Sequence, residues 1–291
     1  MKLLKLVLAV ALMLLIMPQA MAYTIDGKLD DWGITPSELD DGLNNNNVSA
    51  WIPEIATVDW IVENDVYAGY TGYDHGVHVK GIGSTYSSYV EPKVHLVSNP
   101  STEVAEPYAG EYYDVEAMYF DDDECFAYFA IVISDPNCVG DLDFVVDGVE
   151  YGVVLKPHWI GTHYAESGEI YKNPTWEPSD YIIENNKTLI TGGTLLSGKA
   201  EVAILNMTEE FGVSDGGAPT YCIELRIYKP YIGFPENCTW SHVYYAATCG
   251  NDHIENEVHY DYPSVSEFLT VLIPAGIILG FVYLHRKRNE N

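Results

Sequence analysis

Apolar and polar residues alternate in several short segments through the middle of this 291-residue chain. The clearest segments are 114–120, 142–154, 194–205, 220–228 and 240–249, and 125–134 is a strand-length run of almost continuous apolar residues. A period of two places successive side chains on opposite faces, as in a β-strand, and hardly any segment between 23 and 263 has helical periodicity. Many short strands at this spacing predict an all-β fold, a β-sandwich of jelly-roll or immunoglobulin-like antiparallel sheets.

The pattern also predicts a hairpin and two long loops. Asp147-Gly148 lies between two alternating arms, 142–146 and 149–154, and this pair favours a tight β-turn because both central residues need positive φ. The stretches 35–55 and 157–180 break the alternation, and the second is rich in Gly, Pro and aromatic residues. Long loops on a rigid scaffold often carry binding sites.

Two continuous apolar runs flank this middle segment. The first follows Lys2 and Lys5, ends at Met17 and precedes Ala20-Met21-Ala22. A charged start, a short apolar core and a small-x-small site predict a secretory signal peptide over residues 1–22; a membrane anchor is the alternative. Residues 23–263 are then one extracellular domain.

The second apolar run, 268–284, predicts a single membrane-spanning helix within an anchor of residues 264–291. The basic cluster 285–288 follows it, which places the C-terminus in the cytoplasm and the N-terminus outside. Gly276 and Gly280 form a G-x-x-x-G spacing. This spacing allows close approach of two helices and a homodimer, although small residues are common in such spans.

The charge of the chain limits its partners. The chain has 43 acidic and 14 basic residues, a net charge of −29. Such a surface repels nucleic acid and attracts cations, so no nucleic-acid partner is expected.

An exterior location makes two covalent modifications relevant. Four N-x-S/T sequons mark candidate glycosylation sites at Asn47, Asn186, Asn206 and Asn237. The five cysteines allow disulfides and leave one residue over. The pairs expected first are Cys238–Cys249 and Cys125–Cys138, although connectivity does not follow from sequence.

The start of the mature segment, TIDGKLDDWG at 24–33, resembles the first strand of CBM9-like and DOMON-like sandwich domains. The resemblance implies a core position for Ile25, Leu29 and Trp32, a turn at Asp26-Gly27, and solvent contact for the acidic pair 30–31. A role for Trp32 in stacking on a ligand is the rival interpretation.

The tail resembles the PEF-CTERM sorting signal of archaeal surface proteins. Ser266-Glu267-Phe268 precedes the apolar run and the basic cluster, with serine where the family has proline. Blocks 113–135, 140–153 and 242–255 resemble exported proteins with such tails. The resemblance implies a cell-surface protein, with cleavage near the tripeptide and attachment of a lipid.

Clustered acidic residues make calcium the first candidate cofactor, because this cation takes six to eight oxygen ligands. The candidate ligands are Asp121, Asp123, Asp141, Asp143 and Asp252. CBM9-like domains often use calcium structurally. The alternative is that these carboxylates are solvated turn residues.

Aromatic residues in the 157–180 stretch make carbohydrate the first candidate ligand. Trp159, Tyr164, Tyr171 and Trp176 lie near His158, His163 and Glu166. Sugar rings stack on aromatic faces while polar side chains hold their hydroxyls. Simple packing aromatics, or a transition metal on the two histidines, are the alternatives.

Other chemistries find little support in the sequence. DOMON-like domains that hold haem use Met and His ligands, and the exterior segment has only two methionines, Met118 and Met207. Neither haem nor nucleotide is expected. No G-x-S-x-G or H-E-x-x-H motif occurs, and no motif singles out a carboxylate pair.

The sequence therefore predicts a surface-anchored, non-catalytic binding or adhesion protein. Its expected partners are the membrane and glycans or envelope proteins, with structural calcium. A structural envelope component without a small ligand is the second hypothesis, and a glycan-processing enzyme is the third.

Overall fold

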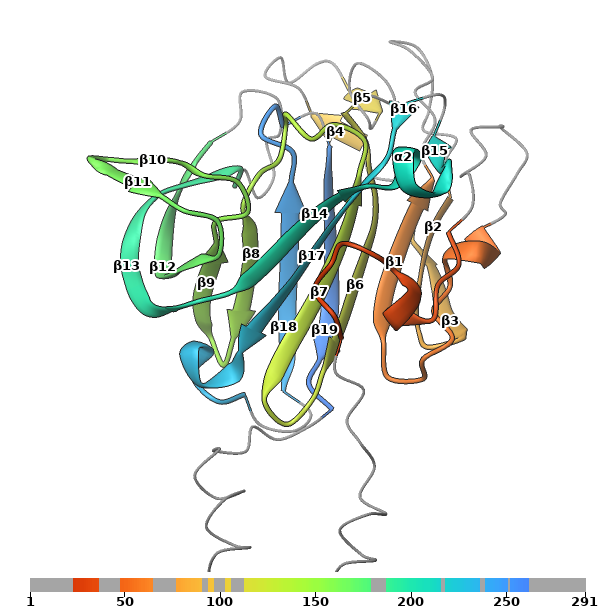
Figure 1. The fold of residues 1–291 in the computed structure, drawn as a ribbon, viewed down its shortest axis with the longest axis horizontal. Coiled ribbons are helices and arrows are strands. Elements are labelled where there is room, and N and C mark those ends of the chain that lie inside the picture. The colour runs from red at the N-terminus through yellow and green to blue at the C-terminus, as the bar shows by residue number, and fades with distance from the viewer. Residues whose placement is uncertain are drawn as a thin grey trace, which may run out of the picture.

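Two large antiparallel sheets dominate the protein (Figure 1). The computed structural model describes residues 23–36, 48–64, 77–90, 94–96, 103–105, 113–178, 187–215, 218–235, 239–250 and 252–261. The seven-stranded sheet has the order β14-β17-β7-β6-β1-β2-β3. Its strands are β1 Asp59–Asn64, β2 Val77–Ile82, β3 Thr85–Val90, β6 Val115–Asp122, β7 Phe126–Ile133, β14 Glu201–Asn206 and β17 Tyr221–Tyr228.

The six-stranded sheet has the order β13-β12-β9-β8-β18-β19. Its strands are β8 Leu142–Val146, β9 Val149–Val153, β12 Glu169–Glu177, β13 Leu189–Lys199, β18 Trp240–Ala246 and β19 His253–His259. Neighbouring strands in both sheets pair antiparallel. The expectation of an all-β fold is confirmed.

Three two-stranded ribbons and a few short helices complete the described elements. The ribbons are β4 Val94–Leu96 with β5 Glu103–Ala105, β10 His158–Ile160 with β11 His163–Ala165, and β15 Ser214–Asp215 with β16 Ala218–Pro219. The helices are η1 Asp30–Trp32, η2 Val48–Trp51, α2 Met207–Phe211 and η4 Lys229–Ile232.

The main hydrophobic core lies between the two large sheets. Phe120 and Phe129 come from the seven-stranded sheet, Phe144 and Val243 come from the six-stranded sheet, and all four are fully buried in one cluster. Phe129 and Phe144 have ring centroids 5.6 Å apart, so the sheets touch through these side chains. Burial of this apolar surface is the main term that holds the two sheets together.

A second core covers the outer face of the seven-stranded sheet. All eight residues of β6 are buried, so both of its faces are covered. We call residues 23–36 the N-terminal cover; this segment, red in Figure 1, lies across the front of β7. Its Trp32 is fully buried with Tyr119 and Tyr128. The predicted burial of Leu29 and Trp32 is confirmed, but the segment forms a turn and η1 instead of a strand.

The Asp147-Gly148 hairpin joins β8 and β9, as the sequence predicts. Both turn residues have positive φ, 50° and 74°. The run 194–205, in contrast, does not form one strand, because it divides at Ala200 between β13 and β14. These two strands belong to different sheets, so the chain changes sheet within an apparently uniform pattern.

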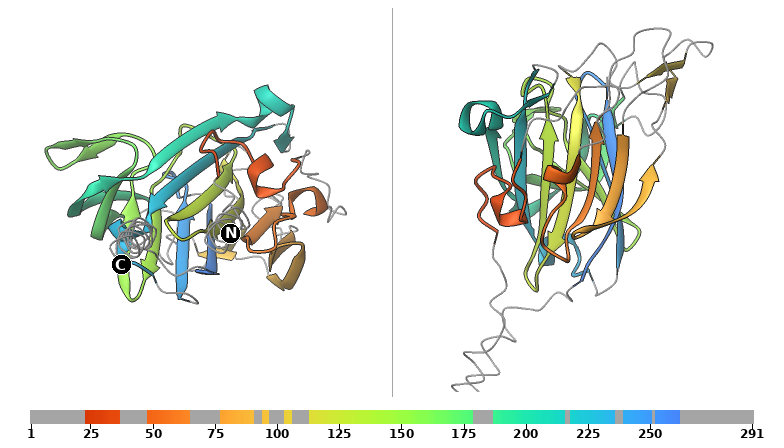
Figure 2. Two further views of the ribbon diagram at one scale, coloured as in Figure 1. Left: turned by 60° about the horizontal axis from the view of Figure 1, so that its bottom comes forward. Right: turned by 90° about the vertical axis from the view of Figure 1, so that its right-hand side faces the viewer.

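The 157–180 stretch contains more regular structure than expected. It forms the β10–β11 hairpin and the nine-residue strand β12. Figure 1 shows the hairpin projecting from the body of the fold beside β12 and β13, and Figure 2 shows the same projection from below.

No helix among the described residues is long and apolar enough to cross a membrane. The predicted signal peptide, the anchor with Gly276 and Gly280, and the Ser266-Glu267-Phe268 tripeptide lie outside the described residues.

Candidate functional site

The β10–β11 hairpin presents two aromatic rings on its outer face. Trp159 and Tyr164 pair directly across the ribbon. Their side chains are 67% and 52% exposed, and their ring centroids are 5.2 Å apart in an edge-to-face arrangement. Exposed neighbouring rings of this kind form an apolar platform that nothing in the described part of the chain covers.

The inner face of the hairpin attaches it to the body of the protein. Ile160 and Ala165 are buried with Val154, Tyr171 and Ile190 in a small cluster. Because residues 159 and 164 share one face of the ribbon, residues 158, 160, 163 and 165 share the other. Because side chains alternate along each strand, the anchoring residues lie on the inner face of the hairpin and the exposed aromatic residues lie on its outer face.

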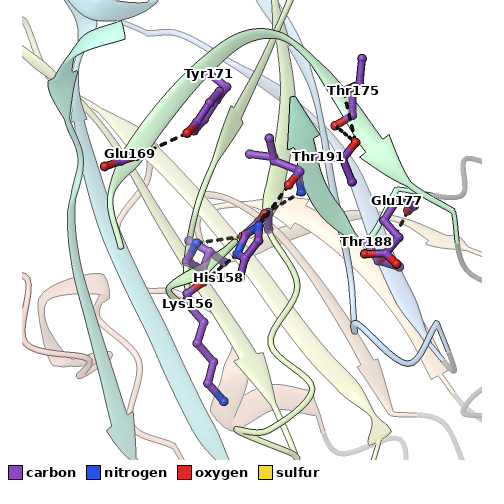
Figure 3. Close-up of polar contacts among 11 residues, drawn as sticks. Lys156, His158, Glu169, Tyr171, Thr175, Glu177, Thr188 and Thr191 are labelled. Atoms are coloured by element: carbon purple, nitrogen blue, oxygen red, sulfur yellow. Dashed lines mark hydrogen bonds and ion pairs between the residues drawn. The ribbon is translucent and has the colours of Figure 1, made fainter. Parts of the chain in front are cut away.

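His158 fixes one side of the hairpin base (Figure 3). Its Nδ1 lies 3.0 Å from the carbonyl oxygen of Lys156, and its Nε2 lies 3.1 Å from that of Ile190. These two contacts connect the ring to the segment that precedes the hairpin and to β13.

Asp141 lies next to the ring nitrogen of His158 that contacts Ile190. Its Oδ2 lies 3.4 Å from His158 Nε2. Asp141 is fully buried and accepts hydrogen bonds from the backbone N–H groups of Leu155, at 3.1 Å, and Ile190, at 2.8 Å. Burial raises the pKa of Asp141, and His158 together with the two N–H groups opposes this rise. One carboxylate thus ties β13, the end of β9 and the hairpin together.

Glu169 fixes the other side of the base. Its Oε2 lies 2.7 Å from His163 Nε2 and accepts a hydrogen bond from the hydroxyl of Tyr171 at 3.2 Å. Lys199 contacts both Glu169, at 3.6 Å, and the exposed Glu166. Burial raises the pKa of Glu169, but its hydrogen bonds and His163 outweigh this, and the net shift is downward.

The four aromatic residues expected to form a ligand platform divide into two pairs. Trp159 and Tyr164 are exposed together, whereas Tyr171 is buried under the hairpin. Trp176 is half-buried and donates its indole N–H to Glu150 at 2.7 Å. Tyr171 and Trp176 therefore support the hairpin, and only the first pair presents free ring faces.

A second exposed tryptophan, Trp240, lies beside a hollow of about 160 Å³. Asp59, Lys80, Asn256 and Glu257 supply its polar lining. Trp240 is 62% exposed and lies 5.2 Å from the His259 ring between centroids. It is a natural comparison for Trp159, because both are exposed tryptophans at the start of a strand or hairpin.

The five aspartates expected to bind calcium lie in separate hydrogen-bond networks. Asp121 accepts from Tyr23 and Thr57, and Asp123 accepts from two backbone N–H groups at the β6–β7 turn and from the hydroxyl of Tyr128 in β7. The remaining three contact His158, Lys187 and the N–H of Val115, respectively, through Asp141, Asp143 and Asp252.

In the described part of the chain, no group of three or more His, Cys, Asp or Glu side chains is arranged to hold a metal ion. Burial raises the pKa of Asp143 to about 6 against the opposing effect of Lys187. Calcium binding stays a prediction.

The structure also locates some of the predicted modification sites. Asn206 caps α2 through its Oδ1, which accepts from Glu209 N at 3.0 Å, and its Nδ2 donates to Tyr221. Asn47, Asn186, Asn237 and Cys238 lie outside the described residues. Cys125 precedes the eight-residue strand β7 and Cys138 follows it; the strand between them is roughly 27 Å long, far more than a disulfide spans.

The anchoring roles of Asp141 and Glu169 were not predicted from the sequence. Asp141 lies 17 residues before His158, and its partners come from β9, the hairpin and β13. No local spacing signals such a contact.

Comparison with protein-family models, with curated protein sequences and with solved structures finds no match to this chain.

Proposed function

We propose that this protein is a non-catalytic carbohydrate-binding protein of the cell surface, and that the β10–β11 hairpin is its binding element. The observation that carries the proposal is the pair Trp159 and Tyr164, exposed side by side on a hairpin whose base is held by two buried carboxylates. A sugar ring has apolar C–H faces that stack on such rings.

The polar groups around the platform suit a sugar ligand. Glu166 and Lys199 are exposed next to β11 and contact each other. These side chains offer acceptors and donors for hydroxyl groups at the edge of a stacked ring. Because the hairpin is already fixed in place, binding costs little ordering of the protein.

The remaining parts of the proposal concern location, which rests on the sequence, and the kind of fold, which rests on the two sheets. The apolar runs at both ends support export and a C-terminal tether, with the binding domain outside the cell. The two sheets and their shared core support a β-sandwich of the jelly-roll or immunoglobulin-like kind. Glycans of the cell envelope or of neighbouring cells are the ligands that such a position offers.

Binding of the full-length chain, purified in detergent, to a glycan array tests this proposal. For any glycan bound saturably, Trp159→Ala and Tyr164→Ala should each weaken the affinity about tenfold or more, because each removes a stacked ring face. Trp240→Ala is the matched control and should bind as the wild type does.

Three results would contradict the proposal in different ways. Loss of binding in the Trp240 variant alone would move the site to the hollow beside β18. Absence of saturable binding to any glycan would favour a structural envelope component. Turnover of chromogenic glycosides that a single Asp or Glu substitution abolishes would favour an enzyme.

A further inference from the structure

Two loops that are distant in sequence meet at one end of the sheets. Residues 134–141 connect β7 of the seven-stranded sheet to β8 of the six-stranded sheet, and residues 247–252 connect β18 to β19. The backbone N–H of Thr248 donates to the carbonyl oxygen of Cys138 at 2.8 Å. The two loops are thus joined directly by a main-chain hydrogen bond.

The contact between the loops is close along several residues. A Cβ atom added to Gly140 would lie 2.0 Å from the carbonyl oxygen of Ala246, so the backbones approach as near as only glycine allows. The N–H of Gly140 also donates to the hydroxyl of Tyr245 at 3.3 Å. Residues 138–140 therefore lie against residues 245–248.

Each loop is also fixed by its own turn. The N–H of Cys138 donates to Asp135 O at 3.2 Å, and the N–H of Gly250 donates to Ala247 O at 2.8 Å, with Gly250 at a φ of 67°. These turns place the cysteines of the two loops next to each other. The thiols of Cys138 and Cys249 are in hydrogen-bond contact, and both residues are partly exposed.

We propose that Cys138 and Cys249 form a disulfide that fastens the β7–β8 crossover to the β18–β19 turn. The thiols are already neighbours on loops that other bonds hold in place, so closure requires little movement of the backbone. Their partial exposure admits an oxidant. This pairing replaces both pairs that the sequence favoured.

The other described cysteines differ from this pair. Cys222 is fully buried in β17, opposite Val132 of β7, and burial raises its pKa well above the ordinary value. Cys125 precedes β7 at the far end of that strand from Cys138. A thiol as buried as Cys222 is inert to exchange.

The chemistry balances as two successive thiol–disulfide exchanges with an external disulfide. The thiol of one cysteine loses its proton to solvent, and the resulting thiolate attacks the external disulfide; one half of that disulfide leaves as a thiolate, takes up a proton, and the other half stays in a mixed disulfide. The thiolate of the second cysteine then attacks the sulfur of the first, forms the Cys138–Cys249 bond and releases the second thiol. Two electrons pass to the external disulfide, which is reduced to two thiols.

Oxidation of the reduced full-length chain with oxidised glutathione tests the proposal. After the remaining thiols are alkylated, digestion with Asp-N and chymotrypsin separates the peptide 135–140, which holds Cys138, from the peptide 246–251, which holds Cys249. Mass spectrometry should find these two peptides joined and about 2 Da lighter than their sum. Joining the ends of a segment of roughly 110 residues should raise the melting temperature by about 5 to 15 °C over the reduced chain.

Two matched variants complete the experiment. Cys138→Ser should lose the joined peptide and the difference in melting temperature between oxidised and reduced chain, whereas Cys125→Ser should keep both. Recovery of both peptides alkylated and separate after oxidation of the wild type would overturn the proposal, as would a joined peptide in which Cys249 is linked to another cysteine. The peptide map of the wild type decides the question even if a variant fails to fold. Glycan binding is measured separately, so failure of one proposal leaves the other standing.

Discussion

A buried carboxylate anchors both the N-terminal cover and the β10–β11 hairpin. The tryptophan of the cover is buried, however, whereas the tryptophan of the hairpin is exposed. Glu224 of β17 accepts hydrogen bonds from Asp26 N at 2.9 Å, Gly27 N at 3.0 Å and the indole of Trp32 at 3.0 Å. Asp141 accepts two backbone N–H groups and contacts His158 at the base of the hairpin. Both carboxylates are fully buried, and burial raises the pKa of each.

The two segments differ in where the anchored tryptophan goes. Trp32 is fully buried with Tyr23 and Tyr119, whereas Trp159 is 67% exposed. Exposure of Trp159 is not a result of loose attachment, because hydrogen bonds of Asp141, His158 and His163 fix the base of the hairpin. A tryptophan that is held rigidly but left in water is well placed to bind a ligand without losing conformational freedom.

Replacing each tryptophan by alanine should give the largest difference in stability between the two segments. Trp32→Ala leaves a cavity in the second core and an unpaired oxygen on Glu224, so the free energy of unfolding should fall by about 3 to 5 kcal/mol. Trp159→Ala removes only exposed surface, and its effect should stay within about 0.5 kcal/mol. Urea denaturation of both variants and the wild type measures this difference.

An equal loss of stability in the two variants would contradict the comparison. It would mean that Trp159 packs against part of the protein that the described residues do not include. A stable Trp32 variant would instead show that the cover contributes little to the fold.

The period-two pattern was sufficient to predict the fold class and most of the strands. It works for β6, β8, β9, β17 and β18 because each strand carries enough β-branched and aromatic residues to fill a buried face, whereas β7 has a continuous apolar sequence because both of its faces are buried. It fails at Ala200, where an unbroken pattern crosses from one sheet to the other. The change of sheet depends on distant partners, since β13 pairs with β12 and β14 pairs with β17.

The candidate site was predicted only in part. Aromatic enrichment pointed to the 157–180 stretch, and Trp159 and Tyr164 are exposed there. Composition alone gave no way to separate this pair from Tyr171, because the direction of each side chain depends on the register of the β10–β11 ribbon. The anchors Asp141 and Glu224 follow from long-range contacts, and a carboxylate has no sequence signature for burial.

The pKa of Glu224 gives a pH test of the cover. Burial raises this pKa from 4.5 to about 7, against the opposing hydrogen bonds of Trp32, Gly27 and Asp26. The folded state therefore binds a proton that the unfolded state has already released between these two values. The stabilisation that Glu224 contributes by holding this proton is fully present below pH 4.5 and is lost as the pH rises through 7. The free energy of unfolding should therefore decrease by roughly 3 kcal/mol over this range.

Denaturation curves of the wild type and of Glu224→Gln between pH 4.5 and 8 measure this effect. The variant should show a flatter decrease, because position 224 no longer titrates. Asp59, Asp121 and Asp143 also have raised pKa values and keep part of the slope in both proteins. Superimposable pH profiles would show that the cover is held without a titrating carboxylate.

Each segment has a glycine with positive φ in a turn, and replacing these glycines by alanine should give the smallest difference in stability between the segments. Gly27 in the cover and Gly161 in the hairpin turn have φ values of 82° and 59°, so alanine is strained at both. An added Cβ at position 27 would lie 2.6 Å from the Cβ of Leu205, whereas at position 161 nothing lies within 4 Å. Gly161→Ala should cost about 1 kcal/mol from backbone strain, and Gly27→Ala about 2 to 3 kcal/mol, because the cover must also shift away from β14. Thermal unfolding of both variants measures the two costs, and equal values would mean that the cover moves freely on the sheet. Glycan binding should survive in Gly27→Ala, since the hairpin has its own anchors in Asp141 and Glu169.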